Sequence, residues 1–317
     1  MLALAARRIG LSLLIVVLAV SLLFGMIHLI PGDPASVMLG PRATPELRAE
    51  LNERMGLDQP VPVQLGRFLV NAATGDLGED PFSRRAVADI VLEQLPYTLA
   101  LIFVALGGAT LLGVPLGCFS AIRRGSWLDR LTAVLSVAFI AVPSFVIALY
   151  ALLLLSVKLR WFPAMGAGEP GDWADQAHHL VLPALAIGLG WVGYIARLVR
   201  ASMLEVLGEN HVRTARAFGL PERVVIGRYA LRIAILPTVT IIGIGIGTTL
   251  SSALFAEIVF SRPGIGKLLY EAVMTRNYPV VMGSVLVTTV FFVACTTAAD
   301  LLNALLDPRL REAEGRR

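Results

Sequence analysis

Side chains that can ligate a metal gather just before residue 180. His178 and His179 follow Asp172 and Asp175 closely, and imidazole and carboxylate groups are common zinc ligands. The two histidines also open an uncharged run, so they fit equally well as the polar flank of an apolar helix. We prefer the polar flank and predict no metal site here.

Two glycine-containing segments resemble nucleotide-binding loops. Gly266-Lys267 fits the end of the G-x-x-x-x-G-K-[ST] pattern, but Ser261 fills its first glycine position and Leu268 its Ser/Thr position. The run Gly243–Gly247 lies inside an apolar stretch with no strand before it, which favours close helix packing over dinucleotide binding. We therefore predict no catalytic residue and no cofactor in this chain.

The elements that must position any such side chains are apolar helices. The 317 residues are 56% hydrophobic and 16% charged, whereas soluble domains carry about 25% charged residues. The net charge of +4 is spread between apolar runs, which indicates orientation in a lipid bilayer and not nucleic-acid binding. Cys118 and Cys295 each lie inside an apolar run and form no disulfide framework.

Uncharged runs long enough for a membrane-spanning helix occur six times. About 20 residues span a bilayer. The first run follows Arg7 and Arg8 and is longer than the apolar part of a signal peptide, so we expect a retained helix. The six runs are Ile9–Gly32, Gln94–Ile122, Leu131–Val157, Gln176–Ala196, Ile233–Ala256 and Asn277–Ala299.

The distribution of basic residues predicts the orientation. Six spans place both termini on one side, and the segments on that side hold more Lys and Arg than Asp and Glu. The short loop with Arg123, Arg124 and Arg130 gives the clearest signal, so we predict that both termini are cytoplasmic. We divide the chain into 1–32, an extracytoplasmic loop region 33–93, and a core domain 94–317.

Two connections are longer than turns. In the predicted outer loop, Thr44 and Pro45 suit the start of a short helix over Glu46–Met55. The predicted inner connection, 197–232, is expected to be helical up to Phe218. Gly219 then suits a left-handed position after a helix, and Pro221 suits the first position of a new helix. Such a corner can dock against another protein, and lipid alone gives no reason for it.

Sequence motifs give the chain a family resemblance. The corner and further landmarks in the same order resemble the permease subunits of ABC importers, specifically the B-type subunits of the dipeptide, oligopeptide and nickel branch. Arg213-Thr214-Ala215 replaces the general Glu-Ala-Ala, and Leu231-Arg232 replaces Leu-Pro, as is typical of this branch; Arg262 departs from it. The motifs are Arg213–Arg223, Ala230-Leu231-Arg232, Leu236-Pro237, Pro31-Gly32-Asp33-Pro34, Gly75-Asp76-Leu77-Gly78, Trp161-Phe162-Pro163, Phe260–Gly266, Tyr278-Pro279-Val280 and Asp307-Pro308-Arg309.

The resemblance implies an all-α integral membrane protein with the importer permease fold, in a bacterial inner membrane. It implies a second homologous permease, two ATPase subunits that bind ATP and Mg²⁺, and an extracytoplasmic binding protein that delivers short peptides. The same scaffold also carries nickel, glutathione or other small solutes. The implied coupling residues, which dock an ATPase, are Arg213, Thr214, Ala215, Arg216, Ala217, Phe218, Gly219, Leu220, Pro221, Glu222 and Arg223.

Polar residues in or near the spans are candidates for the substrate pathway. They are Ser136, Ser144, Glu257 and Asp300. Pro143 interrupts the third run, and we expect a simple kink there in preference to a cavity-lining break. An ion-coupled secondary transporter is the alternative, although no Asp, Glu, Lys or Arg lies mid-span. An intramembrane hydrolase would have to pair Ser136 with His28, and the sequence gives no reason to do so.

Overall fold

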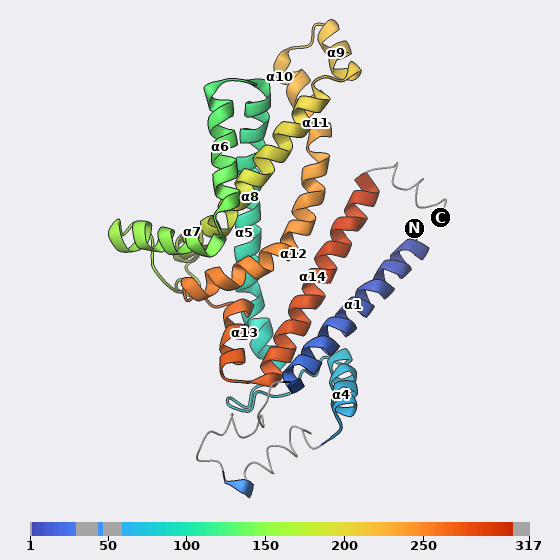
Figure 1. Ribbon diagram of the computed structural model, residues 1–317, viewed down its shortest axis with the longest axis vertical. Coiled ribbons are helices and arrows are strands. Elements are labelled where there is room, and N and C mark those ends of the chain that lie inside the picture. The colour runs from blue at the N-terminus through green and yellow to red at the C-terminus, as the bar shows by residue number, and fades with distance from the viewer. Residues whose placement is uncertain (1, 30–43, 47–58, 307–317) are drawn as a thin grey trace. The chain divides into compact units, whose positions relative to one another are not determined.

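The computed structural model describes residues 2–29, 44–46 and 59–306 (Figure 1). Three predicted features lie wholly or mostly outside these residues: the Pro31–Pro34 motif, the helix over Glu46–Met55, and Asp307-Pro308-Arg309. The chain divides into two compact units. The first unit comprises Met1–Tyr97 and Pro263–Thr297, and the second comprises Thr98–Arg262 and Ala298–Arg317.

The first unit packs helices from both ends of the chain. It contains α1 (Leu2–Leu29), α4 (Val61–Ala73), the start of α5 (Val87–Ile122), α13 (Ile265–Met274) and most of α14 (Tyr278–Leu306). Val20 and Phe24 of α1 are buried against Met282 of α14. A second cluster joins Val87 at the start of α5 to Val280 of α14. Burial of these apolar side chains holds the unit together.

A carboxylate fixes the loop before α5. Asp80 is 8% exposed and accepts hydrogen bonds from the Asn277 side-chain amide at 2.7 Å and the Phe82 N–H at 3.1 Å. The Ser83 hydroxyl also donates to it. Burial disfavours the charged form, but these donors together hold the pKa of Asp80 below its ordinary value. The contact ties the loop that follows Gly78 to the start of α14.

The second unit is built around α8 (Trp173–Val206). The remainder of α5, α6 (Trp127–Ala141) and α12 (Leu236–Val259) surround this helix (Figure 1). Two helices of 8 residues, two helical turns of 3 and 4 residues, and two π-helical segments complete the unit. They are α7 (Ser144–Ala151), η2 (Leu152–Lys158), α9 (Asn210–Ala217), α10 (Glu222–Val224), η3 (Val225–Ala230) and α11 (Leu231–Ala234).

Small residues allow the helices around α8 to approach closely. A Cβ added to Gly117 of α5 would lie 2.4 Å from the Ala196 carbonyl oxygen of α8. One added to Gly193 of α8 would lie 2.6 Å from the Ser136 carbonyl oxygen of α6. Only glycine fits at either contact. Contacts of this kind stabilise helix pairs in lipid, where the hydrophobic effect does not drive association.

Among the described residues, five helices are long and apolar enough to span a membrane, and six if a bent pair counts as one span. The predicted run Gln176–Ala196 proves too short, because α8 continues to Val206. The predicted simple kink in the third run is wrong, because α6 and α7 meet at 100°. Val142, with ψ 123°, is extended as the residue before a proline prefers, and Pro143 has no N–H to continue the helix.

Candidate functional site

The predicted corner is a helix end followed by a tight reversal. α9 ends at Ala217, and Gly219 has φ +75°, the left-handed conformation that the sequence predicted. The Gly219 N–H donates to the Arg216 carbonyl at 2.9 Å and the Leu220 N–H to the Ala215 carbonyl at 3.4 Å. This pair of bonds is a Schellman motif, which satisfies carbonyls that the helix leaves open.

Two details of the predicted corner need correction. Pro221 precedes α10 as its N-cap and is not the first helical residue, because its ψ of 139° is extended. The expected continuous helix up to Phe218 is interrupted between Val206 and Asn210, where Glu209 caps α9. We therefore define the coupling corner as residues 210–230, from the start of α9 to the end of η3.

The coupling corner has a buried face and an exposed face. Val212 and Ala215 of α9 pack with Val225 and Ala230 of η3, in a cluster that extends to Val199 of α8. The corner is thereby anchored to the body of the second unit. Its apex is open: Phe218 is 81% exposed. The other exposed members of the predicted coupling set are Arg213, Thr214, Arg216, Ala217, Gly219, Pro221, Glu222 and Arg223.

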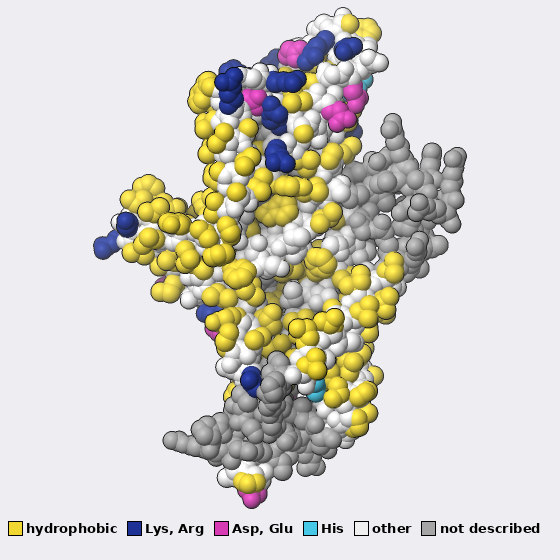
Figure 2. Space-filling view, in the orientation of Figure 1, with side chains coloured by type: hydrophobic (Ala, Val, Ile, Leu, Met, Phe, Trp, Pro, Cys, Tyr) yellow, Lys and Arg dark blue, Asp and Glu magenta, His cyan; other side chains and the backbone are white. Residues whose placement is uncertain are grey.

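An ion pair lies on the exposed face of the corner. The Arg216 Nε donates to Glu222 Oε1 at 2.8 Å, and both side chains are largely exposed. In the second unit, basic side chains gather around the corner and the α5–α6 loop (Figure 2). Combined with an exposed aromatic ring, this surface suits docking to another protein.

A second ion pair lies deeper in the same unit and was not predicted. Arg200 of α8 binds Asp129 of α6 through two contacts, Nε to Oδ1 at 2.6 Å and Nη2 to Oδ2 at 2.9 Å. The Ser120 hydroxyl of α5 and the Gly125 N–H also donate to Asp129. The Asp129 side chain is only 6% exposed. This cluster, which we call the Asp129 lock, joins α5, α6 and α8.

The sequence held one overlooked signal for the lock. Asp129 is the only acidic residue in the arginine-rich segment 123–130. The sequence predicts a loop that sets orientation there, and the predicted fourth span, Gln176–Ala196, ends before Arg200. Both residues lie instead inside helices that cross each other.

A cavity of about 400 Å³ opens at the break between α6 and α7. Ser144, one of the predicted pathway residues, lines it at the start of α7. Pro143 is beside it, and Trp191 of α8 and Thr248 of α12 form the opposite walls. The break at Pro143 therefore borders a cavity.

The other predicted pathway residues lie elsewhere. Ser136 is buried where α6 meets Gly193 of α8 and does not line the cavity. Glu257 is fully buried near the end of α12 and accepts a 2.6 Å hydrogen bond from the Thr98 hydroxyl. Asp300 belongs to α14, but its side chain is outside the described residues. The structure thus does not bring Ser136, Ser144 and Glu257 together in one site.

The histidines considered as metal ligands contact the backbone. His178 Nε2 lies 2.9 Å from the Trp161 carbonyl oxygen, and His179 Nδ1 lies 2.9 Å from that of Asp175. The His178 ring also packs against Phe162. Within the described part of the chain, no cluster of three or more ligating side chains is found. His178 thus helps to hold the Trp161-Phe162-Pro163 segment.

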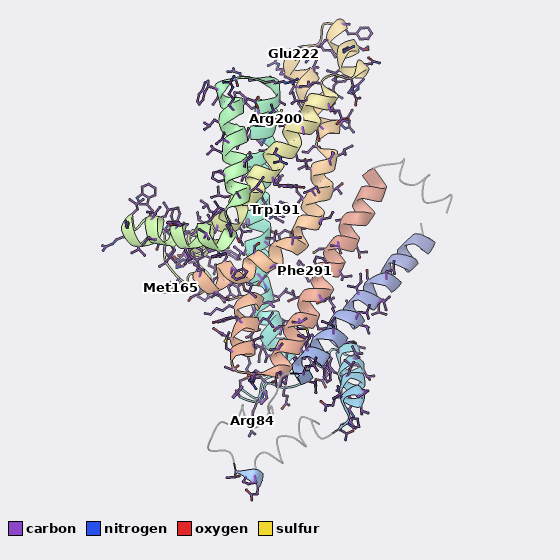
Figure 3. The ribbon with its side chains drawn as sticks, in the orientation of Figure 1. Arg84, Met165, Trp191, Arg200, Glu222 and Phe291 are labelled. Atoms are coloured by element: carbon purple, nitrogen blue, oxygen red, sulfur yellow. The ribbon has the colours of Figure 1, made fainter. Side chains whose placement is uncertain are left out.

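Two helices connect the cavity to the coupling corner. α8 passes the cavity at Trp191, carries Arg200 of the lock and leads into the corner, as Figure 3 shows for Trp191, Arg200 and Glu222. α12 begins at Leu236, soon after the corner, and returns to the cavity at Thr248. The corner is thus continuous along the chain with two helices that line the cavity.

Known proteins share this architecture and sequence. Residues 113–312 match the family model of the binding-protein-dependent transport system inner membrane component, and residues 1–102 match its N-terminal model. The inward-facing MetNI methionine ABC transporter superposes with a TM-score of 0.56 at 20% identity, covering 69% of this chain and 96% of that chain. This superposition supports the fold of the chain as an importer permease.

Three curated relatives match almost end to end. The dipeptide transport permease DppB of Alkalihalophilus pseudofirmus is 35% identical, over 98% of this chain and all of its own. The di/tripeptide permease DppB of Pseudomonas aeruginosa is 38% identical, over 98% and 99%. The glutathione permease GsiC of Salmonella paratyphi A is 36% identical, over 96% and 97%. The chain therefore belongs to the family of inner-membrane permease components of binding-protein-dependent ABC importers.

Proposed function

We propose that this permease carries short peptides and that the coupling corner is where an ATPase subunit docks. The observation that carries the proposal is the corner itself: an exposed Phe218 beside a left-handed Gly219, on a base buried against α8. Two of the relatives named above are dipeptide or di/tripeptide permeases, and the third carries glutathione, itself a small peptide.

The proposed assembly contains a second homologous permease, two ATPase subunits and an extracytoplasmic binding protein. ATP and Mg²⁺ would be bound by the ATPases, and this chain would hold no cofactor of its own. In this arrangement the corner faces the cytoplasm, as the basic residues of the α5–α6 loop and the corner favour.

The proposed mechanism is transmission of a rigid-body movement. When the ATPases close on ATP, the docked corner would shift with them. Because the corner packs on Val199 and its neighbours in α8, and because the Asp129 lock ties α8 to α5 and α6, these helices would move together. Movement of whole helices about an interface is a common way to alternate access.

Reconstitution tests the proposal. The chain is purified with its partner permease and ATPases, placed in proteoliposomes and supplied with binding protein, ATP and a labelled dipeptide. We expect ATP-dependent dipeptide uptake that stops when the ATPases are omitted. The matched control is the same complex with the ATPases inactivated by substitution of their own catalytic residues.

Two results would contradict the proposal. Uptake of nickel or another non-peptide solute, with no peptide uptake, would reject the substrate class. Uphill uptake by the chain alone, driven by a proton or sodium gradient, would support the secondary-transporter alternative.

A further inference from the structure

We propose that the cavity at the α6–α7 break is a binding subsite for an uncharged, preferably aromatic, side chain of the transported peptide. The inference rests on the proposed function and goes beyond it, because it assigns a recognition site within the permease. It arises from the cavity's lining, its rigidity and its position in the second unit.

The lining selects against charge. Fifteen residues border the cavity, and none of them is Asp, Glu, Lys, Arg or His. A charged side chain placed there would find no residue of opposite charge in the lining, and the apolar walls would displace part of its hydration shell at an energetic cost. Apolar side chains gain by leaving water, at roughly 25 cal/mol per Å².

Aromatic rings give the cavity its shape. Phe139, Trp191 and Tyr194 contribute three rings, and aromatic pairs prefer stacked or edge-on contacts. The hydroxyl groups of Ser144 and Ser252 add polarity among these apolar walls, whereas the Thr248 hydroxyl donates to the Gly245 carbonyl oxygen of its own helix. An aromatic side chain with or without a polar tip, such as Phe or Tyr, matches this mixture. A lipid acyl chain could form no hydrogen bond with the serine hydroxyls.

The central ring is held in place before any ligand arrives. Trp191 and Tyr194 pack edge-on, with ring centroids 5.9 Å apart and planes at 74°. On its other side Trp191 lies against Gly245 of α12, where an added Cβ would come within 2.6 Å of the indole. A fixed wall reduces the entropy lost on binding. This close contact also explains why position 245, in the Gly243–Gly247 run, is a glycine.

The size and place of the cavity fit a side chain. About 400 Å³ lies near the lower end of the ~300–1,000 Å³ typical of small-molecule sites. Its walls include α8 and α12, the two helices that flank the coupling corner. A bound side chain would therefore sit between the elements expected to move during transport.

The test uses the complete reconstituted transporter and two labelled peptides, glycylglycine and glycylphenylalanine. Ser252→Phe fills the cavity from α12. Ser251→Phe is the matched control, because Ser251 is exposed on the same helix and does not line the cavity. The binding protein is identical in all samples, so any change in the ratio of the two uptake rates arises in the permease.

We expect Ser252→Phe to lower glycylphenylalanine uptake relative to glycylglycine uptake by about tenfold or more. Ser251→Phe should keep the wild-type ratio. An unchanged ratio in Ser252→Phe would overturn the inference while leaving peptide transport intact. Failure of the wild-type complex to transport either peptide would instead contradict the proposed function.

A second measurement does not depend on a variant remaining active. A dipeptide that carries benzoylphenylalanine is photo-crosslinked to the wild-type complex, and the adducts are mapped by mass spectrometry. We expect adducts at Trp191, Tyr194 or Phe139 that excess glycylphenylalanine suppresses. Adducts found only outside the cavity lining, on lipid or on the second permease, would overturn the inference.

Discussion

Two arginine–carboxylate pairs in the second unit have similar chemistry and opposite surroundings. Arg200 and Asp129 meet where α8 crosses α6, and Asp129 is almost wholly buried. Arg216 and Glu222 meet on the surface of the coupling corner, with side chains 41% and 60% exposed. The first joins helices within the chain, whereas the second leaves its groups within reach of a partner.

The difference shows that burial decides what an ion pair does. A buried carboxylate depends on its partner, since removing one side leaves the other without compensation. An exposed pair is screened by water and contributes little to stability. The lock therefore stabilises the helices that would transmit movement, and the corner remains available for docking.

The largest effect on stability is expected from breaking the lock. Asp129→Ala removes the carboxylate that accepts hydrogen bonds from Ser120, Gly125 and Arg200, and it leaves the Arg200 charge without its partner. We therefore expect the free energy of unfolding to fall by up to ~3–5 kcal/mol. The measurement is the thermal unfolding midpoint of the purified protein in detergent. Glu222→Ala is the matched control, with an expected loss below ~1 kcal/mol. Equal losses for the two variants would remove the distinction between the pairs.

A third carboxylate, in the first unit, should rank next. Asp80 is buried but accepts its hydrogen bonds from neutral groups, so Asp80→Ala should cost about 1–3 kcal/mol at neutral pH. The pKa of Asp80 is lowered on folding from 3.8. Its contribution is therefore complete well above pH 3.8 and declines as the pH falls through the lower folded-state value.

The pH dependence is checked by chemical unfolding of wild type and Asp80→Ala at pH values between roughly 3 and 7. This range includes the ordinary pKa of an aspartate side chain. The difference in unfolding free energy between the two should narrow toward the acidic end. Asp89→Ala, an exposed carboxylate of α5, serves as the control. A difference that stays constant or widens on acidification would show that ionised Asp80 does not stabilise the fold.

A smaller effect on stability, with a large effect on transport, is expected at the corner. Gly219 has φ +75°, where a β-branched side chain costs ~1–2 kcal/mol, although no atom within 4 Å blocks a Cβ. Gly219→Val should thus insert normally but shift the corner, so that transport fails or ATP is hydrolysed without uptake. Gly227→Val is the control, because Gly227 is exposed and has no positive φ.

Expression level, ATPase co-purification and uptake should be measured together for these two variants. Wild-type uptake by Gly219→Val at a normal expression level would show that the corner's conformation is irrelevant to coupling. Equal loss of uptake in both variants would attribute the effect to any change in the corner and not to Gly219.

The sequence predicted what local patterns determine. Apolar runs located the long helices of membrane-spanning length but not α4 or α13. Gly219 was placed in its left-handed conformation because glycine is the residue that adopts it freely after a helix. Gly219 and Pro221, on either side of Leu220, located the corner, although Pro221 is the N-cap of α10 and not its first helical residue.

What the sequence did not reveal depends on contacts between distant segments. The Asp129 lock joins residues 71 positions apart, and no local pattern pairs them. The 100° break at Pro143 exceeds what a proline alone requires, since prolines also produce modest kinks; Pro183 lies inside the continuous helix α8. Whether a proline bends or breaks a helix depends on the helices packed around it.

The most direct test of the coupling corner is a photo-crosslinker in place of Phe218, in the assembled complex within the membrane. Phe218 is 81% exposed at the apex of the corner. We expect an adduct with an ATPase subunit, and none from the same crosslinker at Trp161, which is 62% exposed on the predicted opposite side of the membrane. An ATPase adduct from Trp161 and none from Phe218 would contradict both the docking role and the orientation.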